Sequence, residues 1–424
     1  MFELVDALLV PEHAGVICRF LEVGELWRLL QLDHCIATSP CRVAFEERAA
    51  EMRVYVCGNQ EFADPSVEGL LGPMQCFSPF TGLWESLPAP PVTRSSVNLT
   101  EMDGVLYAGC GQCAGYDEDG TLVKFDPRLG MWQAMPPFLV PRVAYSVVAA
   151  AGRLFAVGGH QKGFMEETLF LACADSAEYL EIGTNSWCFL ENRDVQLARP
   201  LVAQDGDSIY MAPTMDTGID ANDPSFCQTG NSLECLNAET LQWEELAQPL
   251  CSAPSRPTHM AMLLASCGTV YLGNDLHVER YHTSSQVWEF LPPMPDELSH
   301  IDTAEVISRG HLFVCGGKDV GTPGGFSQSF GHFDPQDGCW KLLPVMPQPC
   351  ASPAVLSFGG QIYAFGGSGR GTGKASMRFC LRRKVWEVLR EPAEALLMPE
   401  GIVSMGLRSA RKYPGRPPPS EQNF

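Results

Sequence analysis

Apolar and turn-forming positions recur along most of the chain with a period near fifty residues. Seven of the eight tryptophans follow one another at steps of 45 to 56 residues: Trp84, Trp132, Trp187, Trp243, Trp288, Trp340 and Trp386. Seven positions before each stands an apolar residue: Phe77, Phe125, Leu180, Leu236, Tyr281, Phe333 and Phe379. A polar, turn-forming stretch such as DPRLG separates the two members of each pair. Apolar strand, tight turn, apolar strand is the pattern of a β-hairpin.

A second hairpin precedes the first in each unit. Its closing strand holds an aromatic residue: Tyr55, Tyr107, Phe155, Tyr210, Tyr271, Phe313 and Tyr363. In three units a glycine doublet ends this strand, and in six a glycine three or four positions upstream marks a turn from a leading strand. The first unit has Met52 at that upstream position, which indicates that its leading strand is missing. The segment Gly401–Leu407 has the right distance from Trp386 to supply it, so we predict that it pairs with the strand around Tyr55.

These repeats resemble the kelch repeat, with its glycine doublet, spaced aromatic and tryptophan, over residues 51–407. The resemblance implies an all-β fold: a seven-bladed kelch-type β-propeller of four-stranded antiparallel blades, closed by the C-terminal strand. We expect the tryptophans to be structural, because a sheet of one unit cannot bury its own faces and large rings fill the wedges between blades.

Residues 1–50 lack the repeat and have apolar residues at helical spacing, which predicts a small helical segment. Its pattern resembles the opening of an F-box at Leu9, Pro11, Ile17, Phe20, Leu26 and Leu29. That resemblance implies docking of these residues on the adaptor of a cullin-type (SCF) ubiquitin ligase. The alternative is a helical cap that packs Phe20, Trp27 and Leu30 on the propeller. Residues 408–424 are basic and then proline-rich, which predicts a disordered tail.

Charge and cysteine content restrict the setting. Lys plus Arg total 29 against 50 for Asp plus Glu, and the net charge of −21 argues against nucleic acid and anionic membrane as partners. The sequence shows no secretory signal and no apolar run long enough to span a bilayer. The 17 cysteines have irregular spacing, which favours reduced thiols. We therefore expect a cytoplasmic protein, with the nucleus as a second compartment.

Catalytic and metal-binding motifs are missing from the sequence. The one CxxC, Cys110 to Cys113, has no second ligand pair at zinc-like spacing, and there is no GxSxG, HExxH or P-loop. We predict no metal, no cofactor and no enzymatic activity. The resemblance leaves one alternative open, because some kelch propellers are copper-dependent carbohydrate oxidases or sugar epimerases.

Binding is expected on the loops that follow the second strand of each blade and on the segments that join blades, since both open on one face. Four arginines recur at equivalent inter-blade positions: Arg94, Arg142, Arg199 and Arg256. They predict a positive arc that suits an acidic peptide, with basic character added by His160, Lys162, Lys318 and Arg370. The alternative is that each arginine pairs with an acid of a neighbouring blade.

Two functional hypotheses follow. The first is a protein-binding propeller that serves as the substrate-recognition subunit of a cullin-type ubiquitin ligase. The second is a stand-alone kelch interaction scaffold with no ligase link. Binding of the ligase adaptor distinguishes them.

Overall fold

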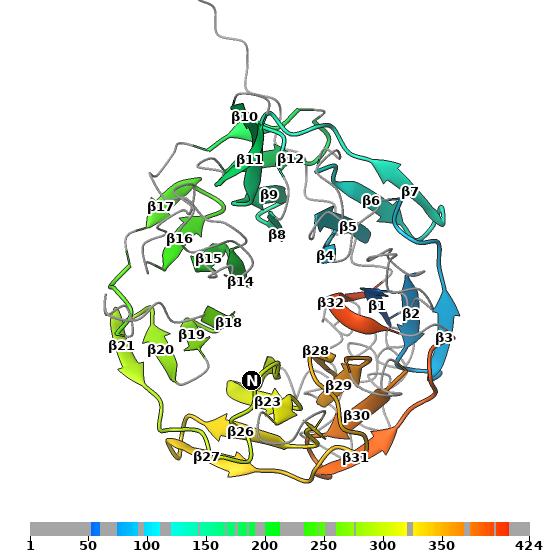
Figure 1. Cartoon of the computed structure of the whole chain (residues 1–424), viewed down its shortest axis with the longest axis vertical. Coiled ribbons are helices and arrows are strands. Elements are labelled where there is room, and N and C mark those ends of the chain that lie inside the picture. Colours follow the sequence, from blue (N-terminus) through cyan, green and yellow to red (C-terminus); the bar gives the residue numbers. More distant parts are fainter. Residues whose placement is uncertain are drawn as a thin grey trace, which may run out of the picture.

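The described part of the chain is a ring of seven four-stranded antiparallel sheets arranged around a common axis (Figure 1). The computed structural model describes residues 52–59, 74–91, 97–110, 120–142, 145–165, 168–173, 177–184, 186–190, 200–212, 233–244, 246–250, 260–274, 277–319, 325–368, 374–393 and 396–406. These residues contain strands and no helix, hence none that could cross a membrane. The predicted seven-bladed all-β fold is therefore confirmed.

Each blade has four strands, which we number from the centre of the ring outward. Blade 1 consists of β32 (Leu397–Gly406), β1 (Met52–Asn59), β2 (Gln75–Ser78) and β3 (Leu83–Ser86). Blade 2 consists of β4 (Val97–Met102), β5 (Val105–Cys110), β6 (Val123–Asp126) and β7 (Met131–Ala134). Blade 3 consists of β8 (Ser146–Ala150), β9 (Arg153–Val157), β12 (Glu178–Glu181) and β13 (Cys188–Phe189). Blade 4 consists of β14 (Leu201–Asp205), β15 (Ser208–Ala212), β16 (Glu234–Asn237) and β17 (Gln242–Glu244).

The remaining three blades repeat the same order. Blade 5 consists of β18 (Met260–Ser266), β19 (Thr269–Asn274), β20 (Val278–His282) and β21 (Val287–Phe290). Blade 6 consists of β22 (Ala304–Ser308), β23 (His311–Cys315), β26 (Phe330–Asp334) and β27 (Cys339–Leu342). Blade 7 consists of β28 (Ala354–Phe358), β29 (Gln361–Phe365), β30 (Ser376–Cys380) and β31 (Val385–Val388). Two extra hairpins, β10 (His160–Met165) with β11 (Thr168–Cys173) and β24 (Lys318–Asp319) with β25 (Gly325–Phe326), are inserted between second and third strands.

The ring is closed by the last strand of the chain. Strand β32 pairs with β1 as the innermost strand of blade 1, in a register that places Val403 opposite Tyr55 and Gly406 opposite Met52. This confirms the predicted closure by the C-terminal strand. Blade 1 thus contains both ends of the propeller, and no blade lacks its inner strand.

In blade 6 the glycine doublet brings the end of the second strand into contact with the linker that leads into blade 7. Gly316 and Gly317 have φ of 71° and 106°, conformations that favour glycine. A Cβ on Gly316 would lie 2.3 Å from the carbonyl oxygen of Cys350, and the Gly317 amide donates to that same oxygen at 2.9 Å. The doublet is therefore required by close backbone contact between blades.

Aromatic rings fill the wedges between blades, as expected. The ring centroid of Trp84 in blade 1 lies 5.0 Å from that of Phe365 in blade 7. Trp386 in blade 7 lies 4.9 Å from Phe330 in blade 6. Trp187 and Trp288 are buried, and the other five repeat tryptophans are partly buried. Each such contact joins two blades that could not bury these faces alone.

The indole N–H groups form a second tie between blades that the sequence did not indicate. Where both partners are described, the tryptophan donates to the carbonyl oxygen four residues after the tryptophan of the preceding blade. The pairs are Trp132 to Pro88, Trp187 to Pro136, Trp288 to Ala247, Trp340 to Pro292, Trp386 to Pro344 and Trp84 to Arg390. Their N···O distances are 2.7 to 3.0 Å. The last pair runs from blade 1 back to blade 7, so the same bond closes the ring.

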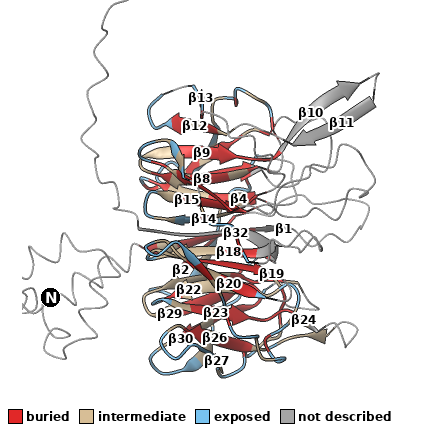
Figure 2. Cartoon of the chain, turned by 90° about the vertical axis from the view of Figure 1, so that its left-hand side faces the viewer, coloured by how far each residue is buried: buried red, intermediate tan, exposed pale blue. Residues whose placement is uncertain are grey.

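Antiparallel order divides the connections between two faces of the disc. Loops between second and third strands and the linkers between blades lie on one face, which we call the linker face. Turns between first and second and between third and fourth strands lie on the other, the turn face. Seen edge-on, β24 lies on one side of the disc (Figure 2). Both inserted hairpins follow a second strand and therefore belong to the linker face.

Candidate functional site

The structure describes four of the eight residues predicted for the propeller binding site. The side chains of Arg142 and Lys318 are described, and His160 and Lys162 are placed by their backbone in β10. The others lie outside the described residues: Arg94, Arg199, Arg256 and Arg370. The F-box-like positions also lie outside them: Leu9, Pro11, Ile17, Phe20, Leu26 and Leu29.

Arg142 is a structural residue of the blade 2 to blade 3 linker. Its Nη2 lies 2.6 Å from Oε1 of Glu178, and neither side chain is exposed. Glu178 also accepts hydrogen bonds from the amides of Leu139 at 2.7 Å and Val140 at 3.0 Å. A buried, paired guanidinium offers no surface to a partner, so the expectation of Arg142 as a binding residue is corrected. The alternative, pairing with an acid of a neighbouring blade, describes this arginine.

The same carboxylate position recurs in the next two blades. Glu178, Glu234 and Glu279 each stand two residues before the apolar third-strand position of blades 3, 4 and 5, and all three are buried. The amide of Leu250 donates to Glu279 at 2.7 Å, as that of Leu139 does to Glu178. Buried carboxylates thus hold inter-blade linkers on this side of the ring. Sequence analysis missed them, although a glutamate at one offset in three consecutive units was a visible signal.

Large aliphatic side chains are exposed on three of the linkers. Leu139 is 46% exposed, Leu250 47% and Ile301 42%. Hydrogen bonds fix the backbone of these linkers. The amides of Leu139 and Leu250 donate to buried glutamates, and Ile301 forms a backbone bridge with Lys318. Exposed apolar side chains on a fixed backbone are typical of protein contact sites, because the backbone does not have to become ordered when a partner binds.

Lys318 lies beside Ile301 on the linker face. Its Nζ is 2.5 Å from Oδ2 of Asp302, and both side chains are about two-fifths exposed, at 40% and 42%. This pair places opposite charges next to the exposed Ile301. The surface of blade 6 therefore has apolar, basic and acidic side chains together, so it does not favour a purely acidic ligand.

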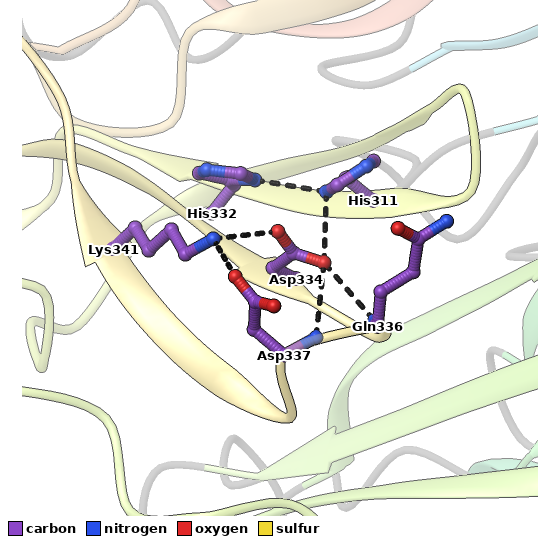
Figure 3. Close-up of polar contacts among 6 residues, drawn as sticks. All are labelled: His311, His332, Asp334, Gln336, Asp337 and Lys341. Atoms are coloured by element: carbon purple, nitrogen blue, oxygen red, sulfur yellow. Dashed lines mark hydrogen bonds and ion pairs between the residues drawn. The ribbon is translucent and has the colours of Figure 1, made fainter.

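The turn face of blade 6 holds a polar cluster (Figure 3). Asp334 ends β26 and accepts hydrogen bonds from Nζ of Lys341 at 2.7 Å and from the amide of Gln336 at 3.0 Å. The hydrogen bond from Lys341 is the main reason that the pKa of Asp334 falls to about 2. Nδ1 of His311 lies 3.1 Å from Nδ1 of His332, so one ring donates a proton and the other accepts it. Burial, and then the neighbouring His311, lower the pKa of His332.

Nucleophilic and metal chemistry finds little support in this part of the chain. Burial raises the pKa of the Cys57, Cys235 and Cys350 thiols to about 12, which keeps them protonated at neutral pH. Among the residues that the structure describes, no three or more His, Cys, Asp or Glu side chains form a group that could hold a metal ion.

Comparison with known proteins gives the same fold class. No protein-family model matches the chain. The chain is 28% identical to Kelch-like protein 35 of Mus musculus over 154 residues, which cover 32% of this chain and 23% of that protein. It is 27% identical to Kelch-like protein 25 of Xenopus tropicalis over 109 residues, 26% of this chain and 18% of that protein. The matches thus span less than a quarter of either relative.

A solved structure shares the architecture. The one titled "Structure of YjhT" superposes with a TM-score of 0.50 and 17% identity, covering 72% of this chain and 99% of that one. At this identity the likeness shows the fold alone. The seven four-stranded blades, together with the similarity to two Kelch-like proteins, support the class of kelch-repeat β-propellers for this chain.

Proposed function

We propose that this propeller binds a protein partner on its linker face. The observation that supports this best is the set of exposed aliphatic side chains, Leu139, Leu250 and Ile301, on linkers that are fixed from below. Both inserted hairpins start from the same face, which adds contact area around these residues. Rigid scaffolds with varied loops on one face are typical of binding proteins.

The partner is a folded protein or a peptide with both apolar and charged groups. Because Arg142 is buried, it cannot contribute to the predicted arc of arginines. Arg94, Arg199, Arg256 and Arg370 remain proposed contacts, together with His160, Lys162 and Lys318. Basic residues at the rim would steer an acidic segment, while aliphatic residues supply the contact itself.

The test is affinity capture from cell extract with the full chain. We compare the wild type with Leu139→Arg combined with Ile301→Arg, which places charge on two linkers. Leu129→Arg is the matched control, because Leu129 is 57% exposed on the turn face. The linker-face variant should lose specific partners that the control retains. Equal capture by both variants would remove the linker face from the proposal.

Residues 1–50 are proposed to bind the adaptor of a cullin-type ubiquitin ligase, which would make the propeller a substrate receptor. This rests on the F-box-like positions in the sequence. The full chain is mixed with purified adaptor and compared with a variant in which Leu9→Asp and Phe20→Asp are combined. Binding by the wild type and not by the variant supports the receptor role. No binding by either leaves a stand-alone interaction scaffold.

A further inference from the structure

Two histidines of blade 6 face each other in the cluster shown in Figure 3. His311 begins β23, and His332 lies in β26 opposite Phe313 of β23. Both side chains are partly buried, and Nδ1 of His311 is 3.1 Å from Nδ1 of His332. The His332 ring also stacks on Phe313, with ring centroids 5.1 Å apart and an interplanar angle of 14°. Neighbouring strands therefore hold the two imidazole rings in contact.

This contact lies at the boundary between blades 6 and 7. Phe330 is on the same side of β26 as the histidine, and its ring centroid is 4.9 Å from that of Trp386 in blade 7. Ser308 is the register partner of His311, and its hydroxyl accepts a hydrogen bond of 2.6 Å from Ser357 of blade 7. A change in the charge of the histidine pair would therefore act where two blades meet.

The short distance allows a proton on only one of the two facing nitrogens. Oδ1 of Asp334 lies 3.9 Å from Nδ1 of His311, so its negative charge favours the proton on His311. His311 then donates to His332, which carries its own proton on Nε2 while its ring is neutral. A second proton, taken from solvent by Nδ1 of His332, breaks this hydrogen bond, because two N–H groups would point at each other.

Charged groups act on His332 from both blades. In blade 6, Lys341 is its register partner in β27, and the Lys341 amine is bonded to Asp334 and Asp337. In blade 7, Lys384 lies in the turn between β30 and β31, and its positive charge acts on the same imidazole. The carboxylate that could compensate a charge on His332 is thus already bonded to a lysine.

A proton on His332 is opposed by its surroundings. Burial lowers the pKa of this imidazole most, then the neighbouring His311, and the two lysines lower it further, whereas Asp334 raises it. On the His311 side, Arg309 adds a basic residue in the turn between β22 and β23. Because the pKa in the fold is below the ordinary 6.5, the neutral ring stabilises the fold fully above that pH, and this stabilisation is lost as pH falls through the lowered pKa.

We propose that His311 and His332 form a proton-sensitive contact, which supports the boundary between blades 6 and 7 at neutral pH and breaks in mild acid when the second ring takes up a proton. Separation of two charged rings disturbs the stack on Phe313 and the neighbouring serine contact between the blades. The response falls between neutral pH and about pH 5. It is distinct from protonation of Asp334, whose pKa is about 2, and it does not depend on a partner at the linker face.

The first test compares thermal unfolding of the full-length wild type and His332→Phe at about pH 7.5 and about pH 5.5. Phenylalanine keeps a ring on Phe313 but cannot take up a proton. Between the two pH values, the melting temperature of the wild type should fall by about 2 °C more than that of the variant. Glu101 and Glu305, whose pKa values are raised mainly by burial, are present in both proteins and act with the opposite sign.

His282→Phe is the matched control. His282 is also a partly exposed histidine of a third strand, in blade 5, but its Nε2 faces the Glu289 carboxylate at 2.9 Å. Because a carboxylate and not a second imidazole faces this ring, the variant should keep the acid response of the wild type. Equal falls in melting temperature for the wild type and His332→Phe, or an equal reduction of the response in His282→Phe, would overturn the proposal.

A second variant, His311→Gln, tests the pair from its other member. The amide can donate to neutral His332 or accept from the charged ring, so the acid response should again become smaller than in the wild type. NMR of ¹³C-labelled histidine follows the His332 signal, which is identified by its absence from the His332→Phe spectrum. Its titration midpoint should move to higher pH in His311→Gln. An unchanged midpoint would show that the two rings do not interact.

Discussion

The buried pair of Arg142 and Glu178 gives the sharpest test of how the inter-blade linkers are held. Glu178→Gln removes the negative charge that faces the buried guanidinium at 2.6 Å, while the 3.3 Å hydrogen bond of Arg142 to the Gly158 carbonyl stays in place. Loss of one member of a buried pair costs about 3–5 kcal/mol of the free energy of unfolding. Arg142→Met is expected to cost less, about 2–3 kcal/mol, because the carboxylate keeps two backbone N–H donors.

The double variant, Arg142→Met with Glu178→Gln, should lose less than the sum of the two single changes, because no uncompensated charge remains. Lys318→Met is the control, since its ion pair with Asp302 is about two-fifths exposed on both sides and contributes under about 1 kcal/mol. Urea unfolding of the full chain, followed by tryptophan fluorescence, measures all four. Strictly additive losses, or a loss under about 1 kcal/mol for Glu178→Gln, would refute the role of the pair in stability.

Three further predictions test the ring, its ties and its acid sensitivity. A chain ending at residue 396 lacks β32, and we expect it to lose the cooperative thermal transition of the full chain; an unchanged transition would contradict closure by β32. Trp386→Phe removes the hydrogen bond from the indole N–H to the Pro344 carbonyl, and urea titration should show a loss of about 1 kcal/mol in the free energy of unfolding. An unchanged free energy of unfolding would contradict a stabilising role for this bond. The depressed pKa of Asp334 means that its stabilisation is complete above the ordinary value of 3.8 and is lost as pH falls through about 2. The melting temperature of Asp334→Asn should therefore fall less than that of the wild type as the pH is lowered through that range. An equal fall in both proteins would contradict the contribution of the Lys341 contact.

The repeat could be predicted from the sequence because its signals are local. A tryptophan, a turn and an apolar residue seven positions earlier define each outer hairpin within one stretch of chain. The spacing from Trp386 to Gly401 was enough to predict the closing strand, since a leading strand follows each of the other six repeat tryptophans at a similar distance. Packing of the tryptophans between blades followed from the small size of each sheet.

Contacts between units could not be predicted in the same way. Glu178 is 36 residues from Arg142, and the stacking of blade 3 on blade 2 is what brings the two together. The indole bonds depend likewise on which backbone carbonyl of the preceding blade faces the ring, as for Trp132 and Pro88. Recurrence of arginine at inter-blade positions therefore suggested an exposed side chain at Arg142, which the fold buries. The F-box-like segment, the proposed contacts outside the described residues and the cellular compartment stay predictions.

Closure by β32 has a consequence for synthesis of the chain. The innermost strand of blade 1 is the last strand of the propeller to leave the ribosome, whereas its neighbour β1 is the first. Throughout translation, β1 waits with an unpaired edge that another nascent chain could occupy. A premature stop between blade 7 and β32 would release a product that has nearly all its repeats but an unpaired edge on β1. Cells should therefore treat such near-complete products as aggregation-prone species that require chaperones or degradation.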